Sequence, residues 1–489
     1  MNAIWLIALP LIAAFLLPIV YQQSQQVGRA LLPTVLLINL LIAALLWRYI
    51  GHAGTQYIAM GGFPVPIGIV FYVDSFALLF VMMLNLGTAL LWLGKPLINI
   101  REEVIILVVV AAGCGLVLSG DLFNVYVFYE ILAVASYGLA ASGNTSAGYA
   151  ASIRYLILGS LGSSLMLLGI AILYALTGTL NLAHFASMSA QLNSPVGLVA
   201  FVLILIGLGV KAELFPVNTW VPEVYSTAPV RVAALLGGIV SKLAFVVILR
   251  LLVLIYTDSH AHLLLLALGT LGVLTGELAA LRSSHLRQVF AYSSIGQLGL
   301  IAIAFSIPNE WGVLAGIAIA LHHTLAKSAL FMLADKWGGY INHLAGAYYT
   351  GKVSTILFLL LALSLIGIPP LPGFWAKLLL LQAGLSVENS WYHVAIAVVL
   401  LATVIETAYF VKILRVLFQS PIQPVAAPRW TELLPALSFA LLLLIATVNL
   451  SSVSEQLKQI ATQAADAQAY ISHTQPAWHP YQPDYFSSQ

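Results

Sequence analysis

The sequence predicts an all-α membrane protein with about fourteen transmembrane helices, and three observations lead to this prediction. Hydrophobic residues make up 61% of the 489 positions and charged residues only 7%, whereas a soluble domain carries roughly 25% charged residues. The apolar residues form long continuous runs, which favours helices over the short alternating strands of a membrane β-barrel. At about 20 residues for each crossing, the roughly 300 apolar residues predict on the order of fourteen helices. This composition excludes a soluble enzyme and a disordered chain, and a net charge of +2 excludes nucleic acid as a partner.

Fourteen apolar stretches follow one another along the chain, and each is long enough to cross a bilayer. They cover about 3–20, 29–50, 73–94, 102–119, 121–142, 150–177, 195–215, 229–256, 262–281, 286–306, 311–335, 353–380, 391–418 and 430–450. The first stretch begins almost at once, without the basic segment and small-residue cleavage site of a signal peptide, so we expect it to be retained.

Basic residues gather in the loops after odd-numbered stretches, or at the helix ends beside them. They are Arg29, Lys95, Arg101, Arg154, Arg231, Arg282, Arg287, Lys336, Lys352, Lys412, Arg415 and Arg429. Only Arg48 and Arg250 lie near the even-numbered loops. Because cytoplasmic loops carry the excess of Lys and Arg, we expect a multi-pass protein of the cell (inner) membrane with both termini on the non-cytoplasmic side.

A short repeat divides the chain into units. The sequence KLAFVVILRLL at 242–252, in the eighth stretch, is similar to TAYFVKILRVL at 407–417, in the thirteenth, so that Ser241 corresponds to Glu406. A repeated unit of five helices has inverted topology in its second copy, as in many secondary transporters. We therefore expect N-terminal helices at 1–101, inverted five-helix units at 102–257 and 258–420 (stretches 4–8 and 9–13), and a last helix with a short polar tail at 421–489.

Several ionisable residues lie inside these apolar stretches, where each costs roughly 2.5–3.5 kcal/mol. We expect a proton relay formed by Glu130, Lys211, Lys242, His322, His323, Lys327, Lys377 and Glu406. A structural role in helix packing is the alternative for each residue, most of all for the two histidines. For Glu213 the two roles weigh equally, and for Glu277 the structural role is favoured.

Prolines break two of the stretches beside these charges. Pro216 interrupts the seventh stretch close to Lys211, and Pro369 and Pro370 interrupt the twelfth just before Lys377. Unwound backbone at membrane depth is tolerated only where it is buried in protein or lines a wet cavity. Both breaks therefore predict local hydration beside a lysine, with substrate sites near broken helices as in transporters.

The residue types in this set suit proton transfer. A desolvated lysine releases its proton more easily and a neighbouring carboxylate holds it more firmly, so we expect Glu130 to act on Lys211. Histidine can pass protons near neutral pH, and His323 shares a helix face with Lys327 whereas His322 points elsewhere. The sequence has one cysteine, Cys114, and no Cys/His spacing typical of a metal site. No metal, cofactor or covalent chemistry is predicted, which favours a transporter subunit over an enzyme.

The segment after residue 450 predicts one short amphipathic helix. Its apolar residues at near-helical spacing are Val453, Leu457, Ile460, Ala464 and Ile471. The aromatic residues between Trp478 and Phe486 fit a partner surface or a frayed tail equally well.

Five sequence pieces carry a resemblance that covers roughly 65–420. They are GDLFNVYVFYE at 120–130, LTGTLNLAH at 176–184, VKAELFP at 210–216, YSSIGQ at 292–297 and GIPPLPGFWAK at 367–377. With these pieces the chain resembles the proton-conducting antiporter-like family, which includes Mrp-type multisubunit Na⁺/H⁺ antiporters and membrane subunits of complex I and of membrane-bound hydrogenases. The first two pieces are most similar to the D subunit of the Mrp-type antiporters.

The resemblance implies fourteen helices with helices 7 and 12 broken, a glutamate–lysine pair at Glu130 and Lys211, a central lysine at Lys242 and an exit-side residue at Lys377. It implies a proton-translocating subunit of a cation (Na⁺)/proton antiporter, with other membrane subunits as partners. The alternative is a proton-pumping subunit of a complex I-like or hydrogenase complex, and a module coupled to inorganic-carbon uptake ranks below both. The chain departs from the family in two places. We expect little more than one short helix after residue 450, so the long lateral helix of the largest complex I and Mrp subunits is missing, and 218–225 lacks the histidine of many complex I relatives, which weighs against a complex I subunit.

Overall fold

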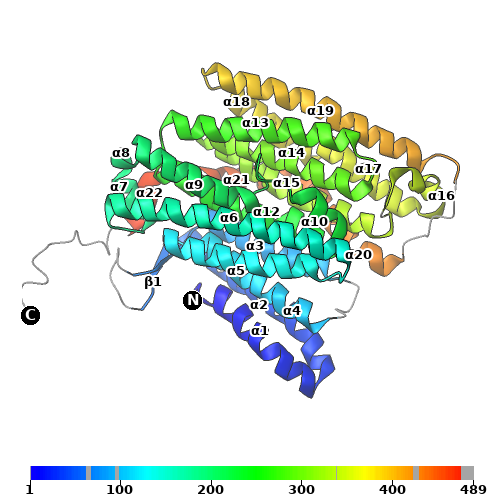
Figure 1. Cartoon of the computed structure of the whole chain (residues 1–489), viewed down its shortest axis with the longest axis horizontal. Coiled ribbons are helices and arrows are strands. Elements are labelled where there is room, and N and C mark those ends of the chain that lie inside the picture. Colours follow the sequence, from blue (N-terminus) through cyan, green and yellow to red (C-terminus); the bar gives the residue numbers. More distant parts are fainter. Residues whose placement is uncertain (1, 62–67, 94–98, 338, 422–428, 475–489) are drawn as a thin grey trace, which may run out of the picture.

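The computed structural model describes residues 2–61, 68–93, 99–337, 339–421 and 429–474. Within them the chain is almost wholly helical (Figure 1). The predictions for Lys95 and for the aromatic tail at 478–486 fall outside the described residues, as does the side chain of Lys336.

The first part of the chain holds five helices and a hairpin. These elements are α1 (Trp5–Gln23), α2 (Gln25–Ala53), β1 (Gln56–Ala59), β2 (Val70–Val73), α3 (Ser75–Leu91), α4 (Ile100–Leu118) and α5 (Leu122–Ala141). The strands pair antiparallel, with Gln56 opposite Val73. The prediction of an all-α membrane fold is confirmed, and this short hairpin is an addition to it, because strands of four residues inside a predicted loop leave little pattern in a sequence.

The middle of the chain surrounds the first break. Its elements are α6 (Ser146–Thr177), α7 (Leu182–Ser187), α8 (Ser189–Leu192), α9 (Pro195–Lys211), α10 (Val221–Thr227), α11 (Val230–Leu235), the π-helix η1 (Leu236–Val240), α12 (Ser241–Leu254), α13 (Ser259–Arg282), α14 (Leu286–Ser306) and α15 (Glu310–Trp337).

The last part surrounds the second break. Its elements are the 3-10 turn η2 (Ile341–Leu344), α16 (Ala347–Thr350), α17 (Lys352–Ile366), α18 (Pro372–Leu385), α19 (Ser390–Leu417), α20 (Trp430–Val448), α21 (Leu450–Ala465) and α22 (Ala467–Thr474).

Helices occupy all fourteen of the predicted stretches. Among the described residues, ten helical segments are long and apolar enough to cross a membrane, and α3, α9 and α17 are apolar but shorter. Helix α4 carries Arg101, Glu102 and Glu103 in its first turn. The chain is therefore a multi-pass membrane protein, while the number of fourteen crossings stays a prediction.

Both predicted breaks are confirmed. Helix α9 ends at Lys211, and Glu213 then adopts a positive φ of 56° before α10 begins. Helix α17 ends at Ile366, and Gly367 takes a left-handed conformation with φ 92° before α18 begins at Pro372. Each break contains a cis peptide bond to proline, at Phe215–Pro216 and at Pro369–Pro370. The released carbonyls find side-chain partners, because the indole of Trp220 donates to Val210 O at 3.1 Å and Lys377 donates to Ile366 O at 3.3 Å.

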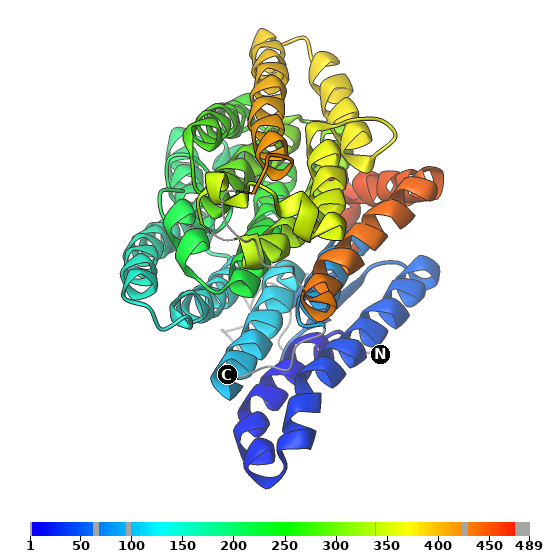
Figure 2. The same cartoon turned by 90° about the vertical axis from the view of Figure 1, so that its right-hand side faces the viewer.

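Helices α12 and α15, which carry the central residues of the predicted relay, lie in the centre of the bundle. Helices α1 and α2 form one edge of the molecule, and α18 and α19 lie at the opposite edge (Figures 1 and 2). Three helical segments are almost completely buried in their most apolar parts, where between 83% and 100% of the residues are buried: Val230–Leu254, Leu286–Ser306 and Glu310–Asp335. In the most apolar part of α1, only 33% of the residues are buried. The scarce ionisable side chains of α12 and α15 are therefore shielded from lipid by other helices.

The predicted amphipathic helix is α21. Its residues Leu457 and Ile460 are buried and Val453 and Ala464 are half-buried, against α15 and α3. Helix α22 then brings Tyr470 onto Tyr72 of β2, with ring centroids 3.9 Å apart. The division into two inverted five-helix units stays a prediction.

Candidate functional site

The buried ionisable residues follow one another through the centre of the bundle, so that each lies within electrostatic range of the next. Most of the predicted set belongs to this succession, which runs from Glu130 on α5 to the pair Lys377 and Glu406 on α18 and α19. Three residues outside the predicted relay, namely Tyr155, Glu213 and Glu277, complete it.

Lys211 lies at the C-terminal end of α9, directly before the first break, and is 3% exposed. Its Nζ donates to the hydroxyl of Tyr155 at 2.6 Å and lies 5.0 and 4.7 Å from the ring centroids of Tyr137 and Tyr155. Glu130 is half-buried and interacts with this lysine electrostatically. The expected partners are therefore neighbours, but the direct hydrogen bond of Lys211 goes to a tyrosine.

Tyr155, the hydrogen-bond partner of Lys211, is a residue that the sequence does not single out, although it carries a hydroxyl inside a long apolar stretch. Helix α6 carries it, and its ring stacks on Trp220 with centroids 3.7 Å apart and planes 11° apart. Trp220 follows the first break and is held by its bond to Val210 O. The stack therefore fixes the Tyr155 hydroxyl against Lys211 on one side and the break on the other.

Glu213 lies within the first break and is 1% exposed. Its Oε1 accepts a hydrogen bond from the Tyr225 hydroxyl at 2.5 Å, and its carboxylate is in electrostatic range of Lys242 and Lys327. The positive φ of Glu213 turns the chain at this point, and the side chain faces the centre of the bundle. Glu213 therefore lies near two lysines of the predicted relay, and its role stays open between structure and proton transfer.

Lys242 is fully buried on α12, directly after the π-helix η1. Its Nζ donates to Gly237 O, and to Ser241 Oγ at 3.1 Å. A π-helix is rare and tends to occur at functional sites. Here the neighbouring Gly238 packs against Ser328 of α15, because a Cβ there would lie 2.1 Å from Ser328 Oγ.

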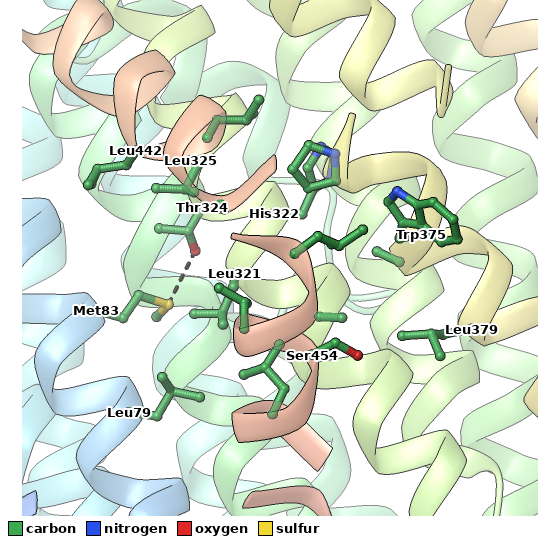
Figure 3. A pocket seen from close by; sticks show the side chains of 18 of the residues that line it. Leu79, Met83, Leu321, His322, Thr324, Leu325, Trp375, Leu379, Leu442 and Ser454 are labelled. Carbon is green, nitrogen blue, oxygen red and sulfur yellow. Dashed lines mark hydrogen bonds between the residues drawn. The ribbon is translucent and has the colours of Figure 1, made fainter. Parts of the chain in front are cut away.

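The two histidines of α15 point to different surroundings, as their spacing predicts. His323 is fully buried and in electrostatic range of both Lys242 and Lys327, and its two ring nitrogens have no hydrogen-bond partner among the described residues. His322 has its Nε2 2.9 Å from Ser364 Oγ of α17 and lies beside the second break (Figure 3). His323 is therefore the histidine between the two central lysines.

The second half of the succession ends in an ion pair. Lys377 Nζ lies 2.7 Å from Glu406 Oε2, and Gln297 donates to Glu406 Oε1 at 2.9 Å. Glu277, which is 3% exposed, is in electrostatic range of Glu406, Lys327 and Lys377. The sequence favours a structural role for Glu277, and the packing of α13 on α14 and α19 places it near Lys327, Lys377 and Glu406.

The arrangement is a series of proton-holding groups. Amines, carboxylates, an imidazole and a phenol in succession can exchange protons through short hydrogen-bonded steps when water is present. Within the described ranges, no group of three or more His, Cys, Asp or Glu side chains could hold a metal ion.

Chains in two solved structures illustrate the similarity of fold. One structure is of the membrane-bound sulfane sulfur reductase, an archaeal respiratory membrane complex, with TM-score 0.89, 31% identity and coverage of 96% of this chain and 99% of that chain. The other is of the Mrp complex from Dietzia sp. DQ12-45-1b, with TM-score 0.88, 25% identity and coverage of 96% and 98%. Both neighbours are parts of multisubunit membrane complexes.

Sequence comparison gives the same group of proteins. The D subunit of the Na(+)/H(+) antiporter of Bacillus subtilis (strain 168) is 31% identical over 401 residues, which cover 77% of this chain and 79% of that protein. The family model described as NADH:quinone oxidoreductase/Mrp antiporter, transmembrane, matches residues 119–406, which extend over more than half of the chain and include the whole succession from Glu130 to Glu406. This protein is a member of the NADH:quinone oxidoreductase/Mrp antiporter transmembrane family.

Proposed function

We propose that this chain is the proton-translocating subunit of a multisubunit cation (Na⁺)/proton antiporter. The observation that carries the proposal is the succession of buried proton-holding groups from Lys211 through Tyr155, Glu213, Lys242, His323 and Lys327 to Glu406. Buried charges in membrane helices are costly and mark ion or proton pathways. The similarity to the D subunit of an antiporter favours this function over others that share the family.

Proton movement in this proposal needs no covalent step. A proton on Lys211 has two neighbours, the Tyr155 hydroxyl and the Glu130 carboxylate, and a change in their balance lets the lysine hold or release it. Glu213 receives the proton on the other side of the break and delivers it to Lys242. Both ring nitrogens of His323 are free of partners among the described residues, and this histidine passes the proton to Lys327. The proton then continues along Glu277, Glu406 and Lys377, which lie within electrostatic range of Lys327.

Water completes these steps where side chains do not touch. The two breaks supply it, because unwound backbone at membrane depth occurs beside wet cavities. Other subunits would carry the sodium path and bind this chain in the membrane. The bilayer is the cell (inner) membrane in this proposal, with both termini on the non-cytoplasmic side, as the distribution of basic residues predicts.

A second function has its own support. The same module serves in redox-driven complexes, as the similarity to a part of the sulfane sulfur reductase illustrates. Proteins that co-purify with the chain distinguish the two: small hydrophobic subunits support the antiporter, whereas iron–sulfur or flavin subunits would overturn it. A role in inorganic-carbon uptake has no observation in its favour beyond membership of the family.

Replacement of Lys242 tests the proposed path. In membrane vesicles, a pH-sensitive dye should report sodium-dependent proton exchange with the native complex and none with Lys242→Ala, although the complex assembles in both. Lys412→Ala, which removes an exposed lysine of α19, is the matched control and should transport normally. Undiminished exchange in Lys242→Ala would show that the path does not run through this lysine.

A further inference from the structure

A cavity of about 680 Å³ opens among α3, α15, α18, α20 and α21 (Figure 3). Neither Lys242 nor Lys327 belongs to its wall. This volume is in the range of roughly 300–1,000 Å³ found for pockets that bind organic molecules. Its wall is aliphatic, aromatic and methionine-containing, as Leu79, Met83, Leu321, Trp375 and Leu379 illustrate. Methionines make such a wall adaptable to flexible ligands.

Polar groups deep in the wall already have protein partners. The hydroxyl of Thr324 donates to Ala320 O at 2.9 Å and contacts Met83 Sδ at 3.3 Å, and His322 Nε2 lies 2.9 Å from Ser364 Oγ. A polar ligand would leave its own groups unpaired there, and an apolar cavity of this kind favours apolar ligands over water. The cavity therefore fits hydrocarbon.

The cavity reaches from buried side chains to the surface of the bundle. Its buried wall includes Met83 and His322, beside the half-buried Pro372 that begins α18 after the second break. Its outer end lies under α21, where Ser451 and Ser454 are exposed. On the same helix, the Lys458 ammonium lies 5.1 Å from the ring centroid of Trp311, the second residue of α15. Tryptophan and lysine together are typical of the membrane–water interface, which places lipid head groups at this end.

We propose that the cavity binds one acyl chain of a membrane phospholipid. The head group lies beside α21, where Lys458 offers a cation to its phosphate, and the chain extends inward until its end contacts His322 and Pro372. A chain in this place excludes water on the lipid side of the second break. The inference does not depend on the proposed proton path.

Photo-crosslinking tests this site directly. The complex is reconstituted in vesicles of phosphatidylethanolamine and phosphatidylglycerol that contain a phospholipid with a diazirine at the end of one acyl chain, and adducts are mapped by mass spectrometry. We expect adducts concentrated on Trp375, Leu379 and Leu325. Ala446→Phe fills the cavity from α20 and should lower their yield on the order of tenfold, which corresponds to about 1.4 kcal/mol of binding free energy.

Ile445→Phe is the matched control, because Ile445 is 48% exposed and is not part of the wall, so its adducts should equal those of the native chain. Ser454→Trp narrows the outer end from an exposed position and gives a second test that does not disturb the interior. Equal yields in all variants would overturn the proposal. So would a tightly bound isoprenoid quinone in solvent extracts, or crosslinks from these positions to a partner subunit.

Discussion

Lys377 of α18 and Glu406 of α19 form an ion pair of 2.7 Å in the second half of the chain, whereas Lys211 in the first half donates its hydrogen bond to Tyr155. The two halves thus hold their break-side lysines differently. A lysine bound to a carboxylate keeps its proton, while a lysine bound to a phenol can lose it at lower cost. In the proposed path this difference makes Lys211 the site of release and Lys377 with Glu406 the site of retention.

Glu406→Gln tests the retention site. The amide keeps the shape and one acceptor, but Lys377 loses its counter-ion in a nearly buried position. Hydrogen bonds to charged groups contribute about 1.5–3 kcal/mol, so we expect sodium-dependent proton exchange in vesicles to fall about ten- to a hundredfold. Glu388→Gln, in the loop before α19 and outside the succession, should behave as the native chain. An unchanged rate in Glu406→Gln would assign this glutamate to structure.

Tyr155→Phe tests the release site. The substitution keeps the ring, its stack on Trp220 and its contact with the Lys211 ammonium, and removes only the hydroxyl. Lys211 is then left with Glu130, so we expect proton release to slow and exchange to fall by on the order of tenfold, the change that about 1.4 kcal/mol produces. Tyr174→Phe, at an exposed position of the same helix, is the control. Native rates in Tyr155→Phe would leave the hydroxyl without a part in transport.

Glu130→Gln tests the other neighbour of Lys211. The Glu130 side chain is half-buried on α5, and its carboxylate interacts electrostatically with this lysine. Without the carboxylate the ammonium is less favourable in the bundle, so we expect strongly depressed exchange in the same vesicle assay. The double variant Glu130→Gln with Tyr155→Phe should lose less of the exchange rate than the product of the two single-variant losses, because both side chains act on the same proton of Lys211. Independent, multiplying effects would contradict a shared role.

Much of this architecture can be predicted from the sequence, because apolar runs mark helices and prolines mark breaks. The separation of His322 from His323 also follows, since adjacent residues of a helix face different directions. Tyr155 and Glu277 cannot be placed, because a single sequence does not reveal which faces of α6, α9, α13 and α19 meet. For the same reason the sequence offers no explanation for Arg250, an exception to the distribution of basic residues.

The structure explains Arg250 by a buried ion pair with Asp74. Arg250 of α12 lies 2.8 Å from Asp74, whose carboxylate also accepts the backbone N–H of Ala77 at the start of α3. The guanidinium carbon of Arg250 lies 5.3 Å from the ring centroids of both Tyr72 and Tyr470, and these two rings pack against each other. A neutralised arginine gives no information on loop orientation, so the remaining basic residues still predict which loops are cytoplasmic.

Asp74→Asn tests this ion pair. Asparagine caps a helix as well as aspartate does, so the start of α3 should persist while Arg250 becomes a buried charge without its counter-ion. Removal of one partner of a buried pair costs about 3–5 kcal/mol, and we expect a markedly lower unfolding temperature in detergent. The double variant Asp74→Asn with Arg250→Met removes both charges and should recover much of the loss. A single variant as stable as the native chain would contradict the structural role of the pair.

Cysteine labelling tests the orientation. Cys114 is buried on α4, so a single introduced cysteine reports on its own position in intact cells. Ser187→Cys, at the end of α7 in a loop predicted to be outside, should react with an impermeant maleimide. Ala147→Cys, at the start of α6 near Arg154, is equally exposed but should react only after the cells are opened. The reverse pattern would invert the topology and, with it, the direction in which protons meet the Lys377–Glu406 pair.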